Sequence, residues 1–183
     1  MDIIIEQNLT DVDFAGRRFK VLNREFELVF LMIHGAKHMW ERLKWLYDIK
    51  DYQLDSIDKN KFYKIAEELK AERIISQTNI LLKKYFNLNS KFGTKKHVHK
   101  YLVWKSIKRI EIVNNLDKSF KELLSELYYS WLLFPAFKYK MGIINCSLFR
   151  LGDISEIDSS FKFVYFLYRP YSFIKRRILN AKQ

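Results

Sequence analysis

The sequence predicts a mainly α fold, a helical bundle preceded by a small N-terminal β element. The 183 residues contain only five glycines and two prolines, which suits long helices with short connections and disfavours a turn-rich sandwich or barrel. Hydrophobic residues make up 49% of the chain, so it can bury a core. At this length we expect one compact domain overall, with the β element at residues 1–22 and the helical domain at residues 23–183.

The β element is predicted from two segments that favour strands. Ile3–Ile5 is a run of β-branched residues, Phe19–Leu22 is rich in apolar strand formers, and Gly16 offers a turn between them. We therefore expect short extended pieces before the first helix.

Helical signals begin at Asn23, a good N-cap, which Glu25 and Glu27 follow in the first turn, where the helix dipole favours acids. No proline occurs before Pro135, so we expect one long helix from about Arg24 to about Tyr52. Apolar spacing, capping patterns and prolines predict further helices at Asp58 to Tyr85, in the basic segment after a linker at 87–94, from a Ser119 and Glu122 capping box to Pro135, and at 161–168 and 171–178.

Cysteine use and hydropathy indicate the compartment. The single cysteine, Cys146, cannot form an internal disulfide, and the N-terminus shows neither a basic leader nor a long apolar stretch. The longest nearly uncharged run, residues 127–137, is about half the ~20 residues required to cross a bilayer. We expect a cytoplasmic protein without a transmembrane segment.

The whole chain has a formal net charge of +12. Its positive charge is concentrated in the second half. Residues 91–109 hold seven Lys or Arg and no acid, and such a field attracts phosphates, nucleic acid or anionic lipid. Tyr101 or Trp104 could stack on bases, although a solvated helix face without a ligand is the ordinary alternative. On the predicted amphipathic helix most basic residues lie away from the apolar side and form a basic face of Lys96, Lys100, Lys105, Lys108 and Arg109.

One stretch, from His34 to Asp48, carries most of the residues capable of chemistry. On a continuous helix with 100° per residue its imidazoles, acids and one indole fall within about 40° of His34. They would form a single stripe composed of His34, His38, Glu41, Trp45 and Asp48.

This stripe has three interpretations. It can be a packing surface in which paired polar groups and Trp45 meet other helices. It can bind a metal through two histidines four residues apart, although H-E-x-x-H is absent and the acids lie farther along. It can handle an anion through the donors Lys37, His38, Arg42 and Lys44. Gly35 costs about 1 kcal/mol in a helix relative to Ala, which indicates that another backbone or a ligand comes close beside His34.

The pattern H-G-x-K-H-x-W-x-R-L-K-W-L-x-D at residues 34–48 resembles the helical signature of an uncharacterised bacterial family of nucleotidyltransferases of the DNA polymerase β type. A second resemblance lies at Asp158, Phe163–Tyr168 and the Arg169-Pro170 pair, which are similar to the closing pattern of that family. Together the two resemblances extend from about Phe14 to Ile178 and correspond to the C-terminal half of the family.

The resemblance implies a catalytic palm N-terminal to this region, in which a Gly-Ser turn precedes an Asp-x-Asp whose carboxylates hold two divalent metals. We identify no such palm and no catalytic residue in this sequence. Its one Asp-x-Asp, Asp11 and Asp13, follows no Gly-Ser and lies where the family has a short strand before the signature helix. Surface acids are therefore the favoured interpretation of Asp11 and Asp13 over metal ligands, and Mg²⁺ and NTP are expected only if a palm is supplied elsewhere.

These observations lead to competing functional hypotheses. The first is a helical accessory or substrate-binding portion of a nucleotidyltransferase-like protein, inactive alone, with a palm domain or subunit in trans and a nucleotide or nucleic acid as partners. The second is an enzyme in its own right that binds metal through Asp11, Asp13 and Asp48. The third is a stand-alone nucleic-acid-binding or protein-interaction module that uses the basic helix of residues 91–109.

Overall fold

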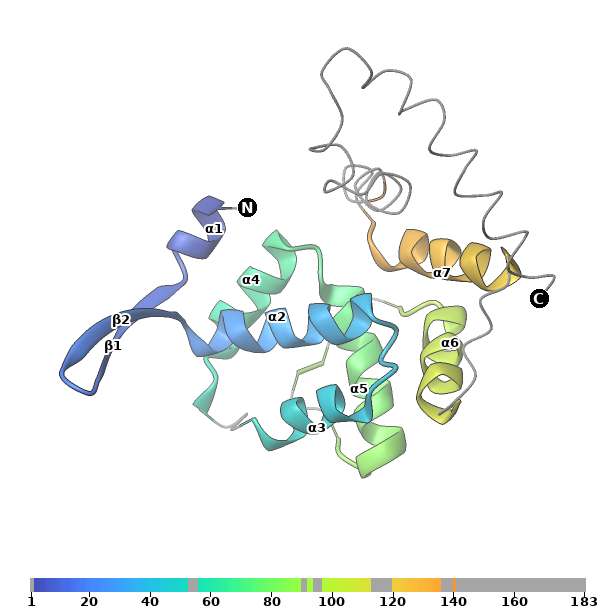
Figure 1. Cartoon of the computed structure of the whole chain (residues 1–183), viewed down its shortest axis with the longest axis horizontal. Helices are drawn as coiled ribbons and strands as arrows, with labels where there is room; N and C mark the ends of the chain where they lie inside the picture. Colours follow the sequence, from blue (N-terminus) through green and yellow to red (C-terminus); the bar gives the residue numbers. More distant parts are fainter. Residues whose placement is uncertain are drawn as a thin grey trace, which may run out of the picture. The chain divides into compact units, whose positions relative to one another are not determined.

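The computed structural model describes residues 2–52, 56–89, 92–93, 97–112, 120–135 and 140 (Figure 1). Contacts group the chain into two compact units, Met1–Glu111 and Ile112–Gln183, and each is described by itself. The described residues are mainly helical and include one small sheet of two antiparallel strands near the N-terminus, so the predicted fold class is confirmed. The single compact domain stays a prediction.

The N-terminal element is a short helix followed by a hairpin: α1 (Asp2–Glu6), β1 (Leu9–Phe14) and β2 (Arg17–Leu22). The expected extended segment at Ile3–Ile5 is wrong, because these residues lie in α1. Asn8 closes that helix by donating its side-chain Nδ2 to the Ile4 carbonyl at 2.8 Å and its backbone N–H to the Ile5 carbonyl at 2.9 Å. These bonds satisfy carbonyls at the helix end and outweigh the strand preference of isoleucine.

The hairpin turn confirms Gly16 as a turn residue. Phe14 pairs with Arg17, so the loop consists of Ala15 and Gly16, whose φ values are 51° and 73°. Two consecutive positive φ values characterise the tight turns that match the twist of a two-stranded hairpin.

Residues Arg24–Lys37 form α2 and Leu43–Asp51 form α3, so the prediction of one helix from Arg24 to Tyr52 is wrong. The chain leaves α2 through a Schellman motif: Met39 N–H donates to the Ala36 carbonyl and Trp40 N–H to the Gly35 carbonyl, both at 2.9 Å. Met39 adopts a φ of 54° and Trp40 a φ of 57°. A fully buried Trp40 side chain holds the break in place.

A second break divides the helix predicted from Asp58 to Tyr85 into α4 (Lys59–Glu68) and α5 (Glu72–Phe86). The same motif recurs here, because Lys70 has a φ of 55° and Ala71 N–H donates to the Ala66 carbonyl at 2.7 Å. Asp58 is confirmed as a helix cap, since its carboxylate accepts from the backbone N–H groups of Asn60 and Lys61.

The core of the first unit forms around α2, which packs against α3, α4 and α5. The last helix of the unit, α6 (Lys100–Glu111), packs against α5. Gln77 joins the two, because its side-chain amide nitrogen Nε2 donates to the Leu102 carbonyl at 3.0 Å and to Ser106 Oγ at 2.8 Å. The largest side chains with almost no exposed surface in this unit are Leu28, Met32, Trp40, Leu46, Ile49, Phe62, Ile74, Ile75, Leu81, Phe92 and Leu102.

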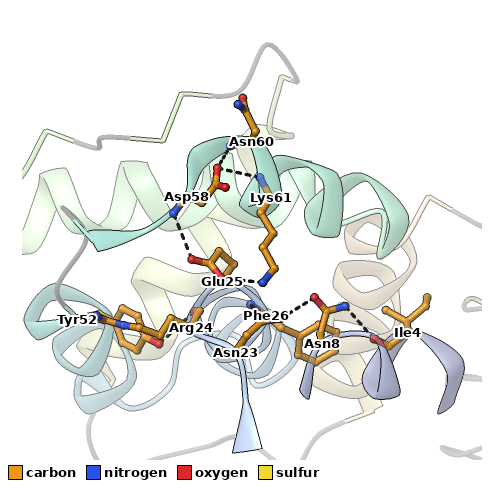
Figure 2. Close-up of polar contacts among 10 residues, drawn as sticks. All are labelled: Ile4, Asn8, Asn23, Arg24, Glu25, Phe26, Tyr52, Asp58, Asn60 and Lys61. Atoms are coloured by element: carbon orange, nitrogen blue, oxygen red, sulfur yellow. Dashed lines mark hydrogen bonds and ion pairs between the residues drawn. The ribbon is translucent and has the colours of Figure 1, made fainter. Parts of the chain in front are cut away.

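Hydrogen bonds and one ion pair attach the start of α2 to its neighbours (Figure 2). The buried N-cap Asn23 accepts from Phe26 N–H at 2.9 Å and donates its Nδ2 to Asn8 Oδ1 at 2.8 Å. On the other side, Glu25 accepts from Asp58 N–H at 3.2 Å and pairs with Lys61 Nζ at 3.5 Å. The start of α2 is therefore tied both to the N-terminal element and to α4.

In the second unit the structure describes α7 (Phe120–Leu133), which ends two residues before Pro135 as predicted. Among the described residues, no helix has both the length and the apolar character needed to span a bilayer. Ser119 of the predicted capping box, the predicted helices at 161–168 and 171–178, Asp158 and Cys146 lie outside the described residues.

Candidate functional site

The break after α2 does not separate the rings of the signature. His34 lies in α2, His38 caps the end of that helix, and Trp45 lies in the first turn of α3. Their ring centroids form a triangle, with 4.8 Å between the imidazoles and 5.4 and 5.2 Å from His34 and His38 to the indole. Phe30 stacks on His34 at 6.2 Å. We call these four residues, Phe30, His34, His38 and Trp45, the ring cluster.

Gly35 and Trp40 produce this arrangement. A Cβ built on Gly35 would lie 2.6 Å from Cε3 and 2.7 Å from Cη2 of the Trp40 ring, so only glycine allows the indole to pack here. The close neighbour expected beside His34 is therefore the side chain of Trp40, which the sequence alone did not identify as an anchor. Its burial reverses the chain, and α3 then packs against α2.

The ring cluster lies at the surface, and basic residues occur before and after His38 in the chain. Phe30 is 45% exposed, His38 is exposed, and His34 and Trp45 are half-buried. The guanidinium of Arg42 lies 5.9 Å from the centre of the Trp45 ring, within cation–π range. Lys37 and Lys44 are also exposed. This combination can stack on a planar group and attract an anion.

The acids of the predicted stripe are placed differently. Glu41 is exposed in the connection before α3, and Asp48 is half-buried in α3, one turn beyond Trp45. Their predicted alignment with His34 required a continuous helix. Because α2 ends at Lys37 and both acids follow the break, that alignment is wrong for Glu41 and Asp48. In the part of the chain that the structure describes, no group of three or more His, Cys, Asp or Glu is arranged to hold a metal ion.

The pKa of His38 is lowered from the ordinary value of a histidine. Desolvation by the surrounding side chains lowers its pKa most, followed by the positive charge that His34 can carry. Lys37 and Arg42 lower the pKa further, whereas Glu41 raises it. At neutral pH His38 is therefore an uncharged imidazole that can both donate and accept a hydrogen bond.

Asp11 and Asp13 lie on one exposed face of the hairpin. Asp11 faces Lys20 across the sheet, and Asp13 faces Arg18. The Asp13 carboxylate lies 3.6 Å from Arg18 Nε, a surface ion pair of the ordinary kind. Each acid thus has a basic residue as its cross-strand neighbour. A metal cation would have to compete with Lys20 and Arg18 for these carboxylates.

The opposite face of the hairpin is apolar and exposed. Cross-strand pairing places the side chains of alternate residues on this face. We call it the hairpin apolar face; its apolar residues, with their exposed fractions, are Val12 (43%), Phe14 (72%), Phe19 (47%) and Val21 (39%), and Thr10 and Arg17 lie at its two ends. Sequence reasoning missed this face, although alternation of Val12, Phe14, Phe19 and Val21 with charged residues was a readable signal.

The basic residues of α6 do not share one exposed face. Lys105 and Arg109 are buried, each with 6% of its surface exposed, on a stripe with Leu102 and Ser106. Lys100 and Lys108 are exposed, and Lys96 lies outside the described residues. The side of α6 that is buried is therefore rotated from the apolar face that the sequence indicated.

The family model described as "Uncharacterised nucleotidyltransferase" matches residues 1–87. This region contains the hairpin, the ring cluster and the whole signature at residues 34–48, so the family resemblance is confirmed there. The second resemblance, from Asp158 to Pro170, lies beyond the match. No curated protein and no solved structure matches the chain.

Proposed function

From the match of residues 1–87 to a nucleotidyltransferase family model, we propose that the chain supplies a helical, substrate-binding portion to a catalytic palm carried by another segment or subunit. In this proposal the chain alone does not turn over NTP. The observation that carries it is the hairpin apolar face.

A two-stranded sheet with one exposed apolar face is an incomplete structure. An isolated hairpin is marginally stable in water, and three or more strands or a covering layer are normally needed. Within the described residues β1 and β2 pair only with each other, so each strand also has an edge available for another strand. A sheet of a palm would extend β1 or β2 and cover Phe14 and Phe19.

The hairpin is held firmly enough to serve as such an attachment. Asn8, just before β1, and Asn23, just after β2, are both buried and hydrogen bonded to each other. Because Asn23 also caps α2, a palm docked on the hairpin would be positioned relative to the helix that carries His34. The 14 residues of α2 extend about 20 Å, so the ring cluster would lie one helix length from that sheet.

The ring cluster suits contact with the part of a substrate that lies away from the reacting phosphates. Trp45 and Phe30 provide surfaces for a planar group, neutral His38 provides a donor and an acceptor, and Lys37 and Arg42 provide positive charge. These side chains are exposed or half-buried, so a ligand can reach them without unfolding the helices.

The test uses the purified 183-residue chain as bait for proteins from the same cells. A partner that carries Gly-Ser followed by Asp-x-Asp should bind, and the complex with Mg²⁺ should release pyrophosphate from NTP. Phe19→Thr should weaken the complex without destabilising the chain, whereas Leu43→Gln, which alters a residue of similar exposure in α3, should not. NTP turnover by the purified chain alone, or equal binding by Phe19→Thr, would overturn the proposal.

A further inference from the structure

A groove of about 670 Å³ lies between α5 and α6 in the first unit. This volume is within the range of about 300–1,000 Å³ that is typical of small-molecule sites. Most of its residues follow residue 87, beyond the family match. None of the lining residues is acidic; they are Ser76, Asn79, Ile80, Gly93, His97, Val98, Lys100, Val103, Trp104 and Ile107.

Trp104 gives this groove an aromatic wall. Its side chain is 47% exposed, although an indole normally buries most of its surface. Tyr101 lies beside it, with 5.6 Å between ring centroids, and Lys108 Nζ lies 4.4 Å from the centre of the ring. An exposed indole with a second aromatic ring and a cation close to it is a platform on which a nucleobase can stack.

Positive charge accompanies the platform. Lys100 lines the groove and is exposed, as is His97, and Lys108 is exposed on the next turn of α6 after Trp104. The acid nearest in sequence on α6, Glu111, is engaged by Lys84 Nζ at 3.5 Å and by the Tyr85 hydroxyl at 3.3 Å. The groove therefore offers cations to an anionic ligand, and no acidic residue lines it to repel that ligand.

Hydrogen bonds hold the walls in place before any ligand binds. Tyr63 donates its hydroxyl to the Gly93 carbonyl at 2.9 Å, and Asn79 Nδ2 donates to the Phe92 carbonyl at 2.6 Å. The bonds from Gln77 to the backbone and Ser106 of α6 join the two helices beneath. A preformed groove lowers the ordering cost of binding.

From the stacking platform, the cations and the preformed apolar walls, we propose that this groove binds a nucleobase with an attached phosphate. The base stacks on Trp104 against Ile80 and Val103, and Lys100 and Lys108 contact the phosphate. The ligand can be a free nucleotide or one unit of a single-stranded nucleic acid, which share this chemistry. The proposal is independent of the catalytic palm and of the ring cluster.

The first experiment measures binding of AMP, UMP and a fluorescent oligouridylate to the full chain at about 50 mM salt, where phosphate contacts are strong. Trp104→Ala should weaken binding by roughly 5- to 150-fold, as expected for loss of one base–aromatic stack, and Trp104→Phe should retain most of it. For the oligouridylate, Lys108→Gln should reduce the slope of log affinity against log salt by roughly 0.7. Circular dichroism verifies that each variant folds.

Trp131 offers a matched control in the second unit. It is 42% exposed, and Lys140 Nζ lies 4.3 Å from the centre of its ring, so it reproduces the exposed indole and its cation without the groove. Trp131→Ala should leave binding unchanged. An equal loss of binding in Trp131→Ala would show that any exposed indole suffices and would overturn the proposal.

Competition distinguishes the sources of the ligand. If AMP or UMP displaces the oligouridylate and depends on Trp104, a free nucleotide fills the groove; if only the oligouridylate binds and depends on Trp104, the ligand is a single strand. Decanoate tests whether the apolar walls instead serve a long-chain carboxylate. The proposal fails if neither AMP, UMP nor the oligouridylate binds. Trp104-dependent binding of decanoate in that case would assign the groove to a long-chain carboxylate instead.

Discussion

The indole of Trp40 packs directly on the Cα of Gly35, where a Cβ would lie 2.6 Å from ring atom Cε3. The two residues are also joined by the hydrogen bond from Trp40 N–H to the Gly35 carbonyl at 2.9 Å. They occupy the two ends of the Schellman motif that terminates α2, positions between which an apolar contact is common. The signature glycine therefore determines where the helix ends, and thereby brings Trp45 back to His34.

Replacing Gly35 by alanine should destabilise the protein despite the better helix propensity of alanine. The gain of about 1 kcal/mol in propensity is smaller than the cost of forcing a methyl group into a fully buried ring, so we expect a net loss of about 2 kcal/mol in the free energy of unfolding. Urea denaturation measures it. Gly93→Ala is the control, because a Cβ there meets nothing within 4 Å.

A double-mutant cycle tests whether the Trp40 ring is the cause. Trp40→Leu should cost less in the Gly35→Ala background than in the natural sequence, because the smaller side chain leaves room for the new methyl group. Equal costs in the two backgrounds would mean that Gly35 is required for another reason.

Lys70→Gly should stabilise the protein. Lys70 is exposed and has a φ of 55° at the end of α4, where a residue with a Cβ costs roughly 1–2 kcal/mol and glycine is preferred. After the entropic cost of glycine, we expect a gain of about 0.5–1 kcal/mol in the free energy of unfolding by urea denaturation. Lys64→Gly, at an exposed position inside α4, should instead lose about 1 kcal/mol; stabilisation of both variants would contradict this explanation.

These helix ends explain why the sequence predicted the fold class but not the helix lengths. Glycine or proline normally marks a helix end, yet Met39 and Lys70 occupy the left-handed positions at the two breaks. Their local cost is repaid by tertiary packing of Trp40 and of Ala71, both fully buried. Because single-sequence patterns report local preference, they do not reveal a break that distant contacts stabilise.

The sequence predicted that His34, His38 and Trp45 lie together on one continuous helix. They do lie together, but two helices bring them there. His34 and His38 lie one turn apart at the end of α2, so their proximity needed no further information. Trp45 reaches them because α3 packs back on α2, not because the helix continues. The sequence did not predict the buried stripe of α6, because Lys105 and Arg109 are charged and charged residues are normally expected at the surface.

Asn23→Ala should cost about 2 kcal/mol in the free energy of unfolding, near the upper limit for loss of an N-cap. The substitution removes the acceptor for Phe26 N–H and also leaves the buried Asn8 Oδ1 without its donor. Thermal or urea denaturation measures the loss. An effect below about 0.5 kcal/mol would be inconsistent with a buried cap.

Asn23→Asp separates the cap from the link to the hairpin. A carboxylate still accepts from Phe26 N–H and suits the N-terminus of a helix, so α2 should be destabilised less than by alanine. It cannot donate to Asn8 Oδ1, so amide hydrogen exchange over residues 9–22 should accelerate in both variants. Unchanged exchange in Asn23→Asp would show that the Asn8 contact does not hold the hairpin.

The pKa of His38 makes stability depend on pH in a defined direction. Its pKa is lowered from the ordinary 6.5 by desolvation and by neighbouring positive charge, so the unfolded chain binds this proton more readily than the folded protein. The contribution of His38 to stability is complete above pH 6.5 and is lost as the pH falls through the lower folded-state value.

His38→Gln should therefore flatten the decline in the free energy of unfolding between about pH 7 and about pH 5. His97→Gln, which removes an exposed imidazole elsewhere in the first unit, controls for the loss of one titrating group. An NMR titration of the imidazole protons measures the pKa directly, and a His38 value at or above 6.5 would contradict the prediction. Because Arg42 and Lys37 contribute to the lowering, neutralising Arg42 as Arg42→Gln should move the His38 pKa back toward 6.5.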